Sequence, residues 1–519
     1  MSAVNAAEAY TPAMTDFRSN AVLKSVLKWG LWAAFNAFAL YLVVVLYAQQ
    51  QTAFALLGLV VTGIASYVFI SKRAYAHRYI YPAVAGMLIF VIFPLLYTVG
   101  IGFTNYSGSN LLSLQQAQTY HLQQTYVSGA RLPFTVHRND DGLRLQVAQP
   151  DGSVLVSEVL AEGAEPAQIE LSLSTAGSSL GDALPLREVI ALRKQLEQWV
   201  FVEPNGELLR LYGLREVAAV RPLYRLLENG DLLNNRSSER LTLDTQQGFY
   251  VDSRGNTMAP GFTVYTGWDN FARVLTDASI RGPFLQIFAW TVAFAALTVV
   301  FTLAVGLVLA SLLQWELVRG KAFYRMMLIL PYAVPAFISI LVFKGLFNQN
   351  FGEINLVLDS LFGARPDWFS DPTLARSMIL IVNTWLGYPY MLLLCMGLLQ
   401  AIPRDLYEAS AIDGASPVDN LLRITLPLLI KPLMPLLIAS FAFNFNNFVL
   451  ITLLTSGAPD IIGATTPAGT TDLLVSYTYR IAFQDSGQNF ALAAAIATLI
   501  FILVGAMAWL NLKLTKVKV

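Results

Sequence analysis

The stretch SFAFNFNNFVLI, residues 440 to 451, carries amides, a hydroxyl and aromatic rings within otherwise apolar sequence. Helical periodicity of 3.6 residues gathers five side chains on one face: Ser440, Phe443, Asn444, Asn447 and Ile451. Uncharged amides beside aromatic rings suit a neutral ligand with many hydroxyls and apolar C–H faces, because hydrogen bonds and stacking recognise it without an ionic anchor. A sugar has this chemistry. The same asparagines could instead hydrogen-bond to neighbouring helices, so both interpretations stay open.

Two other stretches combine aromatic residues with prolines. NTWLGYPYM covers residues 383 to 391, and LPYAVPAFI covers residues 330 to 338. Prolines interrupt helical hydrogen bonds and leave kinks that cavity-lining or moving helices can use. A static kink explains them equally well.

The composition identifies a membrane protein. Of 519 residues, 55% are hydrophobic and 13% charged, compared with about 25% charged in soluble proteins. The 34 Lys and Arg residues balance the 34 Asp and Glu residues, and this zero net charge argues against a nucleic-acid partner. A polytopic α-helical protein is expected, with about eight apolar runs long enough to cross the lipid bilayer. They are 29–48, 52–71, 81–103, 284–313, 326–347, 377–399, 427–454 and 490–511.

Basic residues orient these spans. They concentrate at one set of loop ends, while the opposite short loops carry few bases and several acids. By the positive-inside rule, both termini are expected in the cytoplasm. The residues on the inner side are Arg18, Lys24, Lys28, Lys72, Arg73, Arg78, Arg319, Lys321, Arg325, Arg404, Arg423, Lys431, Lys513, Lys516 and Lys518.

A long polar segment, residues 105 to 280, separates the third span from the fourth and is expected on the periplasmic side. Alternating apolar residues around Pro150-Asp151-Gly152 and around Pro204-Asn205-Gly206 predict two β-hairpins. Residues 186 to 199 have helical spacing. The segment therefore predicts an inserted α+β domain that buries its own core.

A charged stretch, EASAIDGASPVDNLLRITLPLL (408 to 429), lies between the sixth and seventh spans. Its first helix is expected to start near Pro403, to carry Asp405 and Glu408 close to its N-terminus, and to stop at Gly414. The helix would present a small apolar surface. Since the loop has too few bases for an interfacial helix, this surface favours docking on a cytoplasmic protein. That surface is formed by Leu406, Ala409 and Ile412.

A second short helix is expected directly after this stop. Ser416 suits its N-cap, Pro417 its first position, and Asp419 completes an acidic version of the capping box. Pro427 is expected to bias Leu426 out of helical geometry and to open the next span.

Several kinds of chemistry find no support. The central parts of spans four to eight hold no Asp, Glu, Lys or Arg, whereas proton-coupled carriers commonly place one there. Sodium coupling through carbonyls and hydroxyls stays possible. Gly320-Lys321 lacks the rest of a nucleotide-binding P-loop. The 3 histidines have no ligand spacing, and the single Cys395 suits a buried thiol. We therefore expect no cofactor or metal in this chain, and an energy source in another subunit.

The charged stretch resembles a known motif. Residues 408–410, Gly414 and 424–427 match the pattern E-A-A-x3-G-x9-I-x-L-P of membrane subunits of binding-protein-dependent ABC importers, with Ser410 in place of the second Ala. The resemblance covers a permease core of about residues 281–519. It implies that the loop 401–427 is the coupling helix seated in a cytoplasmic ATPase. The implied coupling residues are Glu408, Ala409, Ser410, Gly414, Ile424, Leu426 and Pro427.

Within that family, the extra helices of residues 1–104 and the insert of residues 105–280 resemble the larger membrane subunits of maltose/maltodextrin importers. This implies a transporter subunit, with no catalytic residues, that moves maltose and maltodextrins by alternating access across the inner membrane of a Gram-negative bacterium. By motif match, the implied sugar-binding residues are Tyr332, Leu386, Gly387, Tyr390, Ser440, Phe443, Asn444 and Asn447.

The resemblance also implies partners. They are a second, smaller membrane subunit, an ATPase dimer that binds ATP and Mg²⁺, and a periplasmic maltose-binding protein docking on the insert and on residues 456–489. Three alternatives remain. An ion-coupled symporter should show an internal repeat of its spans, and none is visible. A membrane-anchored receptor or assembly factor would use the asparagines for packing only. The third is an importer of another neutral solute.

Overall fold

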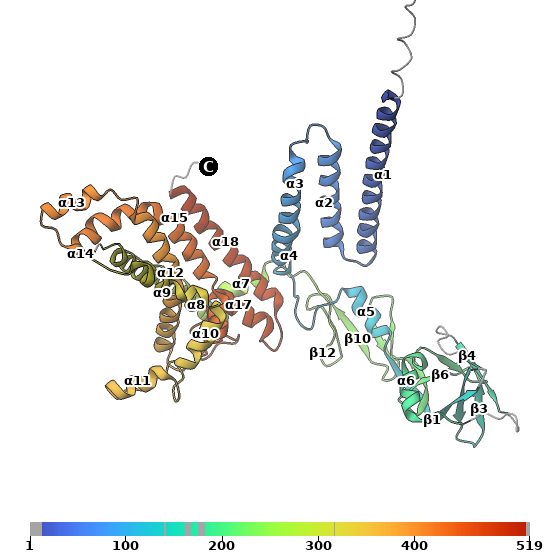
Figure 1. The fold of residues 1–519 in the computed structure, drawn as a ribbon. Coiled ribbons are helices and arrows are strands. Elements are labelled where there is room, and N and C mark those ends of the chain that lie inside the picture. Colours follow the sequence, from blue (N-terminus) through green and yellow to red (C-terminus); the bar gives the residue numbers. More distant parts are fainter. Residues whose placement is uncertain (1–12, 140–141, 161–167, 175–181, 316, 515–519) are drawn as a thin grey trace, which may run out of the picture. The chain divides into compact units, whose positions relative to one another are not determined.

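The computed structural model describes residues 13–139, 142–160, 168–174, 182–315 and 317–514 (Figure 1). The chain forms two compact units. One comprises Met1–Thr104 with Gly267–Val519, and we call it the membrane unit; the other, Asn105–Thr266, is the insert. The tail of residues 1–12 and the predicted inner lysines Lys516 and Lys518 lie outside the described residues.

The membrane unit begins with three apolar spans. The first two are α1 (Ala13–Ala48) and α2 (Thr52–Ile70), and the third is assembled from α3 (His77–Met87), a π-helical turn η1 (Leu88–Ile92) and α4 (Phe93–Ile101). Ser66 of α2 donates a hydrogen bond of 2.6 Å to Asn36 of α1. Arg78 caps the end of α2 by donating to the carbonyls of Val68 and Phe69.

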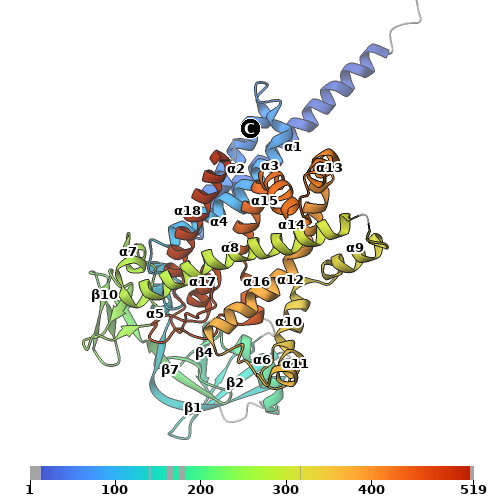
Figure 2. The same cartoon turned by 90° about the vertical axis from the view of Figure 1, so that its left-hand side faces the viewer.

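The rest of the membrane unit is a bundle of helices around α8 and α12 (Figure 2). The two pack against each other more extensively than any other pair of described helices, and α15 contacts both. The bounds are α7 (Asp269–Thr276), α8 (Ala278–Gln314), α9 (Lys321–Ile329), η2 (Leu330–Ala333), α10 (Ala336–Leu346), α11 (Glu353–Phe362), α12 (Pro372–Leu399), α13 (Arg404–Ile412), α14 (Pro417–Asp419), η3 (Asn420–Thr425), α15 (Leu426–Phe445), α16 (Phe448–Leu454), α17 (Leu474–Phe483) and α18 (Phe490–Leu514).

Glycines allow α8 and α12 to approach closely. A Cβ added to Gly306 of α8 would lie 2.7 Å from the Leu392 amide nitrogen, and one added to Gly387 of α12 would lie 2.8 Å from the Thr302 methyl carbon. Close approach of backbones through small residues is how helices in lipid gain packing energy. Gly387, predicted to bind sugar, therefore lies at a helix–helix contact.

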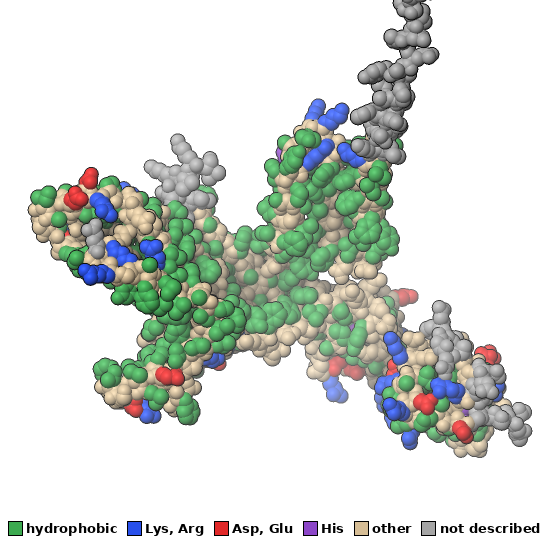
Figure 3. Space-filling view, viewed as in Figure 1, with side chains coloured by type: hydrophobic (Ala, Val, Ile, Leu, Met, Phe, Trp, Pro, Cys, Tyr) green, Lys and Arg blue, Asp and Glu red, His purple; other side chains and the backbone are tan. Residues whose placement is uncertain are grey.

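The predicted number of spans agrees with the structure. Seven described helices are long and apolar enough to cross a membrane, and the pair Lys321–Ala333 and Ala336–Leu346, bent by 90°, makes up to eight. The bend lies at Val334 and Pro335, whose extended backbones interrupt the helix. Apolar side chains cover the surface of these helices in Figure 3, as a lipid-facing bundle requires.

Two expectations for the seventh span are wrong. The expected helix 427–454 is broken at Asn446 and Asn447, so that α15 ends at Phe445 and the short α16 follows. Leu426 is helical, with φ −61° and ψ −47°, although it precedes Pro427. The π-helical turn η3 carries the helix past the proline without needing its missing amide hydrogen, so that Pro417–Phe445 runs on as one 29-residue helical segment.

The insert combines two β-structures. Strands β1 to β7 close into a barrel, in which β4 and β5 pair in parallel and the other neighbours are antiparallel. A five-stranded sheet has the order β12-β11-β10-β9-β8, and α5 (Leu114–Leu122) contacts β8. The strands are β1 (Thr125–Asn139), β2 (Gly142–Ala148), β3 (Val154–Ser157), β4 (Gln168–Leu173), β5 (Val200–Val202), β6 (Leu208–Leu211), β7 (Glu216–Pro222), β8 (Tyr224–Leu226), β9 (Leu232–Asn234), β10 (Arg240–Asp244), β11 (Phe249–Val251) and β12 (Thr257–Met258).

Both predicted hairpins are confirmed. β2 pairs with β3 across the turn at Pro150-Asp151-Gly152, and β5 pairs with β6 across the turn at Pro204-Asn205-Gly206. The predicted helix is α6 (Leu186–Leu196). The barrel has its own core, which includes Trp199 and Phe201. The insert ends at Thr266, before the expected boundary at residue 280, since α7 packs with α8 and α18 of the membrane unit.

The glycine contact between α8 and α12 gives a stability prediction. Gly306→Ala should destabilise the chain by about 1–3 kcal/mol, because the new methyl group meets backbone that cannot turn away. Gly282→Ala in the same helix is the matched control, since its Cβ meets no atom within 4 Å. Thermal unfolding of the purified chain in detergent measures both. Equal midpoints for the two variants would contradict the close packing.

Candidate substrate site and coupling loop

The predicted polar face lies at the break between α15 and α16. Asn444 is 6% exposed and donates a hydrogen bond of 2.8 Å to the Ser440 carbonyl one turn earlier. Asn447 is the N-cap of α16, and its Oδ1 accepts a bond of 3.4 Å from the Leu450 amide. The face was predicted from one continuous helix, whereas the structure builds it from a helix end and a cap. Ser440, Asn444 and Asn447 nevertheless lie together.

Asn383 of α12 joins these residues and was missing from the predicted site. Its Nδ2 donates to Asn444 Oδ1 at 2.8 Å, and its Oδ1 accepts from Asn447 Nδ2 at 3.2 Å. A signal for it existed in the sequence. Asn383 precedes Tyr390 by seven residues, about two helical turns, which places both on one face of α12.

The predicted aromatic residues are accessible. Phe443 is 75% exposed, Tyr332 51% and Tyr390 37%, so their rings are free to receive a ligand or a partner. Tyr332 lies in η2, which contacts α12, the helix that carries Tyr390. The Tyr388 hydroxyl donates a hydrogen bond of 2.9 Å to the Leu328 carbonyl, which links α12 to α9. Tyr332, Tyr388 and Tyr390 thus lie on two elements that contact each other.

Leu386 and Gly387 differ from the other predicted ligands. Leu386 is half-buried against the cluster that includes Phe294 and Val382, and Gly387 packs on Thr302. Both pack between helices in this structure. Of the eight predicted residues, these two have mainly helix-packing surroundings.

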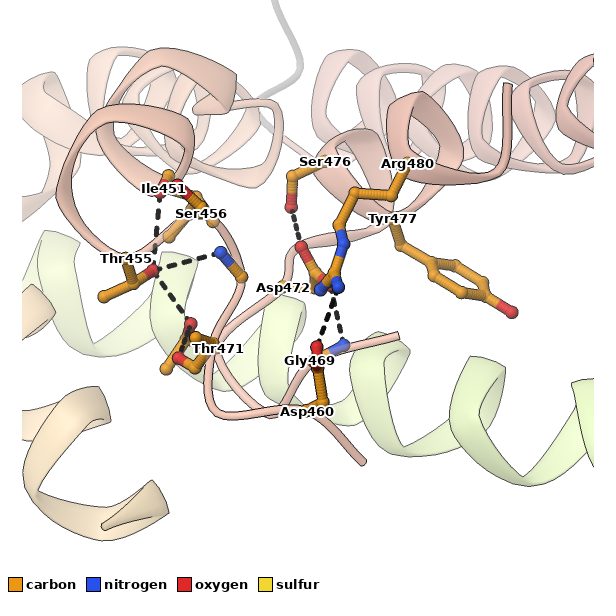
Figure 4. Close-up of polar contacts among 12 residues, drawn as sticks. Ile451, Thr455, Ser456, Asp460, Gly469, Thr471, Asp472, Ser476, Tyr477 and Arg480 are labelled. Carbon is orange, nitrogen blue, oxygen red and sulfur yellow. Dashed lines mark hydrogen bonds and ion pairs between the residues drawn. The ribbon is translucent and has the colours of Figure 1, made fainter. Parts of the chain in front are cut away.

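The loop after α16 is built around a buried ion pair that sequence reasoning missed (Figure 4). Asp472 is fully buried and accepts bonds of 2.8 Å from Arg480, from the Ser476 hydroxyl and from the Gly469 amide. Burial raises the pKa of the Asp472 carboxyl, and the Arg480 guanidinium opposes this effect. The sequence signal for this ion pair was Asp472 just before α17 and Arg480 within α17.

Contacts around this ion pair fix the course of the loop. Arg480 also donates a hydrogen bond of 2.7 Å to Asp460, whose side chain is 73% exposed. Thr455 and Thr471 share a buried hydrogen bond of 2.9 Å. Gly457 has φ +88°, and a Cβ there would collide with the Asp472 carboxylate. The expected docking loop 456–489 therefore has a rigid base.

The charged stretch forms the expected helical hairpin. α13 runs from Arg404 to Ile412 with Pro403 as its N-cap, and Gly414 stops it with φ +76°. Ser416 and Asp419 form the predicted capping box at the start of α14. The apolar surface is exposed as expected, with Leu406 at 43% and Ile412 at 87%. Glu408 and Ala409 are exposed as well, which leaves this side of α13 open to a partner.

Two hydrogen bonds tie α13 to the following helix. The Ser410 hydroxyl donates a hydrogen bond of 2.6 Å to Asn420 Oδ1. The hydroxyls of Tyr407 and Thr425 share a second hydrogen bond of 2.9 Å. Ser410, which replaces an alanine of the family motif, thus has a structural partner. Ile424 and Leu426 are half-buried in the helical segment that leads into α15, and Pro427 is exposed.

Comparisons with known proteins cover nearly the whole chain. Residues 26–73 match the family "MalF, N-terminal region, transmembrane helices", residues 112–267 match "Maltose transport system permease protein MalF P2 domain", and residues 303–516 match "Binding-protein-dependent transport system inner membrane component". The maltose/maltodextrin transport system permease protein MalF of Vibrio parahaemolyticus is 54% identical over 95% of both chains. The chain belongs to the MalF family.

Two further relatives and one solved structure are similar to this chain. MalF of Vibrio vulnificus is 55% identical over 95% of both chains, and MalF of Escherichia coli K12 is 53% identical over 95% of this chain and 97% of its own. A solved bacterial ABC transporter that imports alginate matches with a TM-score of 0.41 and 19% identity, over 48% of this chain and 83% of that chain.

Membership in the MalF family confirms three expectations. The chain is the permease subunit of an ABC importer and an inner-membrane protein. It is a transporter component and not an enzyme, since ATP hydrolysis in such importers belongs to a separate subunit. The fold expected from sequence, a bundle of apolar helices with an inserted β-containing domain, is confirmed as well.

The buried ion pair gives a second stability prediction. Asp472→Asn should destabilise the chain by about 3–5 kcal/mol, because it removes the buried partner of Arg480, whose side chain is only 12% exposed. Asp460→Asn removes the exposed partner of the same arginine and should have a much smaller effect. Thermal unfolding of the purified variants compares them. If the unfolding midpoints of Asp472→Asn and Asp460→Asn fall equally, the buried Asp472 carboxylate is not the main partner that holds Arg480.

Proposed function

We propose that this chain forms the membrane path for maltose and maltodextrins and carries them from periplasm to cytoplasm by alternating access. The accessible Phe443 ring on the same helix as the buried amide of Asn444 is the observation that carries the proposal. Aromatic rings stack on the C–H faces of sugars, and amides bind their hydroxyls. The relatives, 53–55% identical, are named maltose/maltodextrin permeases, which supports this substrate over another neutral solute.

The proposed ligand residues are those of the motif match, with roles that follow from their chemistry. Phe443, Tyr332 and Tyr390 supply stacking surfaces, and Ser440, Asn444 and Asn447 supply hydrogen bonds. Leu386 and Gly387 would reach the sugar only in a conformation that opens the α8–α12 contact. For the cycle to do work, sugar must bind the outward-facing and inward-facing forms with different affinity.

Orientation and partners belong to the same proposal. Both termini face the cytoplasm of a Gram-negative bacterium, and the insert lies in the periplasm, as the distribution of Lys and Arg favours. A periplasmic maltose-binding protein docks on the insert and on residues 456–489. A second, smaller MalG-like membrane subunit completes the path. A MalK-like ATPase dimer binds ATP and Mg²⁺, so this chain needs no cofactor.

The proposed coupling site is the hairpin that includes α13. Its exposed Glu408 and Ala409 and its apolar surface would sit in a groove of the ATPase. Ser410, Gly414, Ile424, Leu426 and Pro427 would keep the hairpin in shape and joined to the bundle. Closure of the ATPase dimer would then move α13 as a rigid body.

Uptake into vesicles tests the proposal. Vesicles containing this chain, the second membrane subunit and the ATPase should accumulate labelled maltose only with ATP inside and the binding protein outside. Phe443→Ala should lower uptake about tenfold through lost stacking, while Phe90→Ala, an equally exposed ring in η1, should not. Uptake driven by a proton or sodium gradient alone would favour the symporter alternative, and unchanged uptake by Phe443→Ala would remove the proposed site.

The coupling site has a separate prediction. Gly414→Ala forces a side chain into φ +76°, which costs about 1–2 kcal/mol and distorts the end of α13. We expect the amount of maltose transported per ATP hydrolysed to fall several-fold, with normal assembly. Gly363→Ala is the matched control, because Gly363 ends α11 with φ +65° and, like Gly414, has no atom within 4 Å of an added Cβ. An unchanged ratio for Gly414→Ala would argue against coupling through this turn.

A further inference from the structure

Helices α1 and α2 pair in antiparallel fashion, and their pairing brings basic residues to one end. The Ser66 hydroxyl donates a hydrogen bond to Asn36, and one turn nearer that end the rings of Trp32 and Phe69 lie 5.3 Å apart. One further turn along α1 reaches Lys28, and the same step along α2 passes the end of that helix. Lys28 therefore lies level with the loop that follows α2.

That loop carries two more bases, Lys72 and Arg73. Both side chains are exposed, and neither makes a hydrogen bond or an ion pair with the described residues. The loop itself is well anchored, because Ala74 is buried and Arg78 both caps α2 and stacks over the Tyr75 ring at 5.0 Å. Two bases without partners are thus presented from a fixed loop.

Acidic residues are missing from this part of the sequence. Between Asp16 and Asp140 the chain has no Asp or Glu. Figure 3 shows Lys and Arg side chains gathered at the end of α2 and α3, with no Asp or Glu among them in this view. Neighbouring positive charges repel one another unless an anion lies between them. The countercharge for these bases therefore comes from outside this part of the chain.

An apolar groove follows the face of α1 that begins beside Lys28. Its volume is about 530 Å³, and its lining residues are Leu27, Lys28, Leu31, Trp32 and Phe35. The Nε1 atom of Trp32 is buried and has no hydrogen-bond partner among the described residues. An indole N–H can only donate, so this group needs an acceptor oxygen from another molecule. The groove thus joins apolar walls to one unpaired donor.

We propose that Lys28, Lys72 and Arg73, together with the groove on α1, bind one anionic phospholipid. The headgroup phosphate lies among the three bases, an acyl chain lies in the groove, and the Trp32 N–H donates to an ester oxygen between them. The bases need an anion and the groove needs a hydrocarbon chain, and an anionic lipid supplies both at the membrane surface. The inference does not depend on the sugar path, since an inner-membrane protein meets such lipids whatever it transports.

Photocrosslinking in vesicles tests this site. The assembled transporter is reconstituted in phosphatidylcholine with a trace of photoreactive phosphatidylglycerol, and labelled peptides of this chain are mapped after irradiation. In the unaltered chain, the label should concentrate on residues 27–35 and 72–79. Excess unlabelled phosphatidylglycerol should displace it, whereas excess phosphatidylcholine or inorganic phosphate should not. The double variant Lys72→Gln, Arg73→Gln should lower this labelling about tenfold, because two of the three bases are gone.

Two further variants separate the site from general effects of charge and insertion. Arg319→Gln, Arg325→Gln removes two exposed bases from the connection between α8 and α9 and should leave the labelling unchanged. Leu31→Trp fills the groove without altering any charge, and it should lower the labelling several-fold. This variant decides the question if the Lys72 and Arg73 double variant inserts or assembles incorrectly.

Several outcomes would overturn the lipid site. Equal labelling by photoreactive phosphatidylcholine would show that the bases select no anionic lipid, and displacement by inorganic phosphate would indicate a site for free anions. Labelling of the isolated chain that disappears in the assembled transporter would make the groove a contact with another subunit. Unchanged labelling in both the double variant and Leu31→Trp would place the lipid elsewhere. Maltose uptake enters none of these measurements, so failure of the proposed function is detected separately.

Discussion

Polar groups buried between membrane helices must find their hydrogen-bond partners inside the protein, because lipid offers none. The membrane unit meets this constraint with neutral groups. Asn383 joins α8 through Thr298 to α15 through Asn444 and to the cap of α16 through Asn447. The bundle thus supports the break between α15 and α16 with neutral amides that join three helices.

Charge appears instead in the loop after α16, where Asp472 and Arg480 are paired. Their partners are backbone and side chains of the same loop and helix, so the pair shapes a local structure rather than a path through the membrane. Close contacts at Gly306 and Gly387 likewise shape the local packing of α8 against α12. The membrane unit therefore keeps ionic bonds at its edge, with neutral amides and tight packing inside.

Sequence alone predicted the elements that depend on local rules. Apolar length located the spans, turn residues located both hairpins of the insert, and Ser416 with Asp419 marked a helix start. It missed what depends on distant partners. Periodicity treated residues 427–454 as one helix, because the support for the break at Asn447 comes from α12. The rule for residues before proline failed at Leu426, since a π turn accommodates Pro427. Closure of the barrel by β1 and β7 joins strands too far apart for pattern reasoning.

The unbroken helical segment from Pro417 to Phe445 has a mechanical consequence. At about 1.5 Å per residue, its 29 residues extend on the order of 40 Å. Two hydroxyl contacts fasten α13 to its N-terminal end, and Phe443 and Asn444 lie near its C-terminal end. As a rigid lever, the segment would turn a tilt of a few degrees at the hairpin into a displacement of ångströms at its far end.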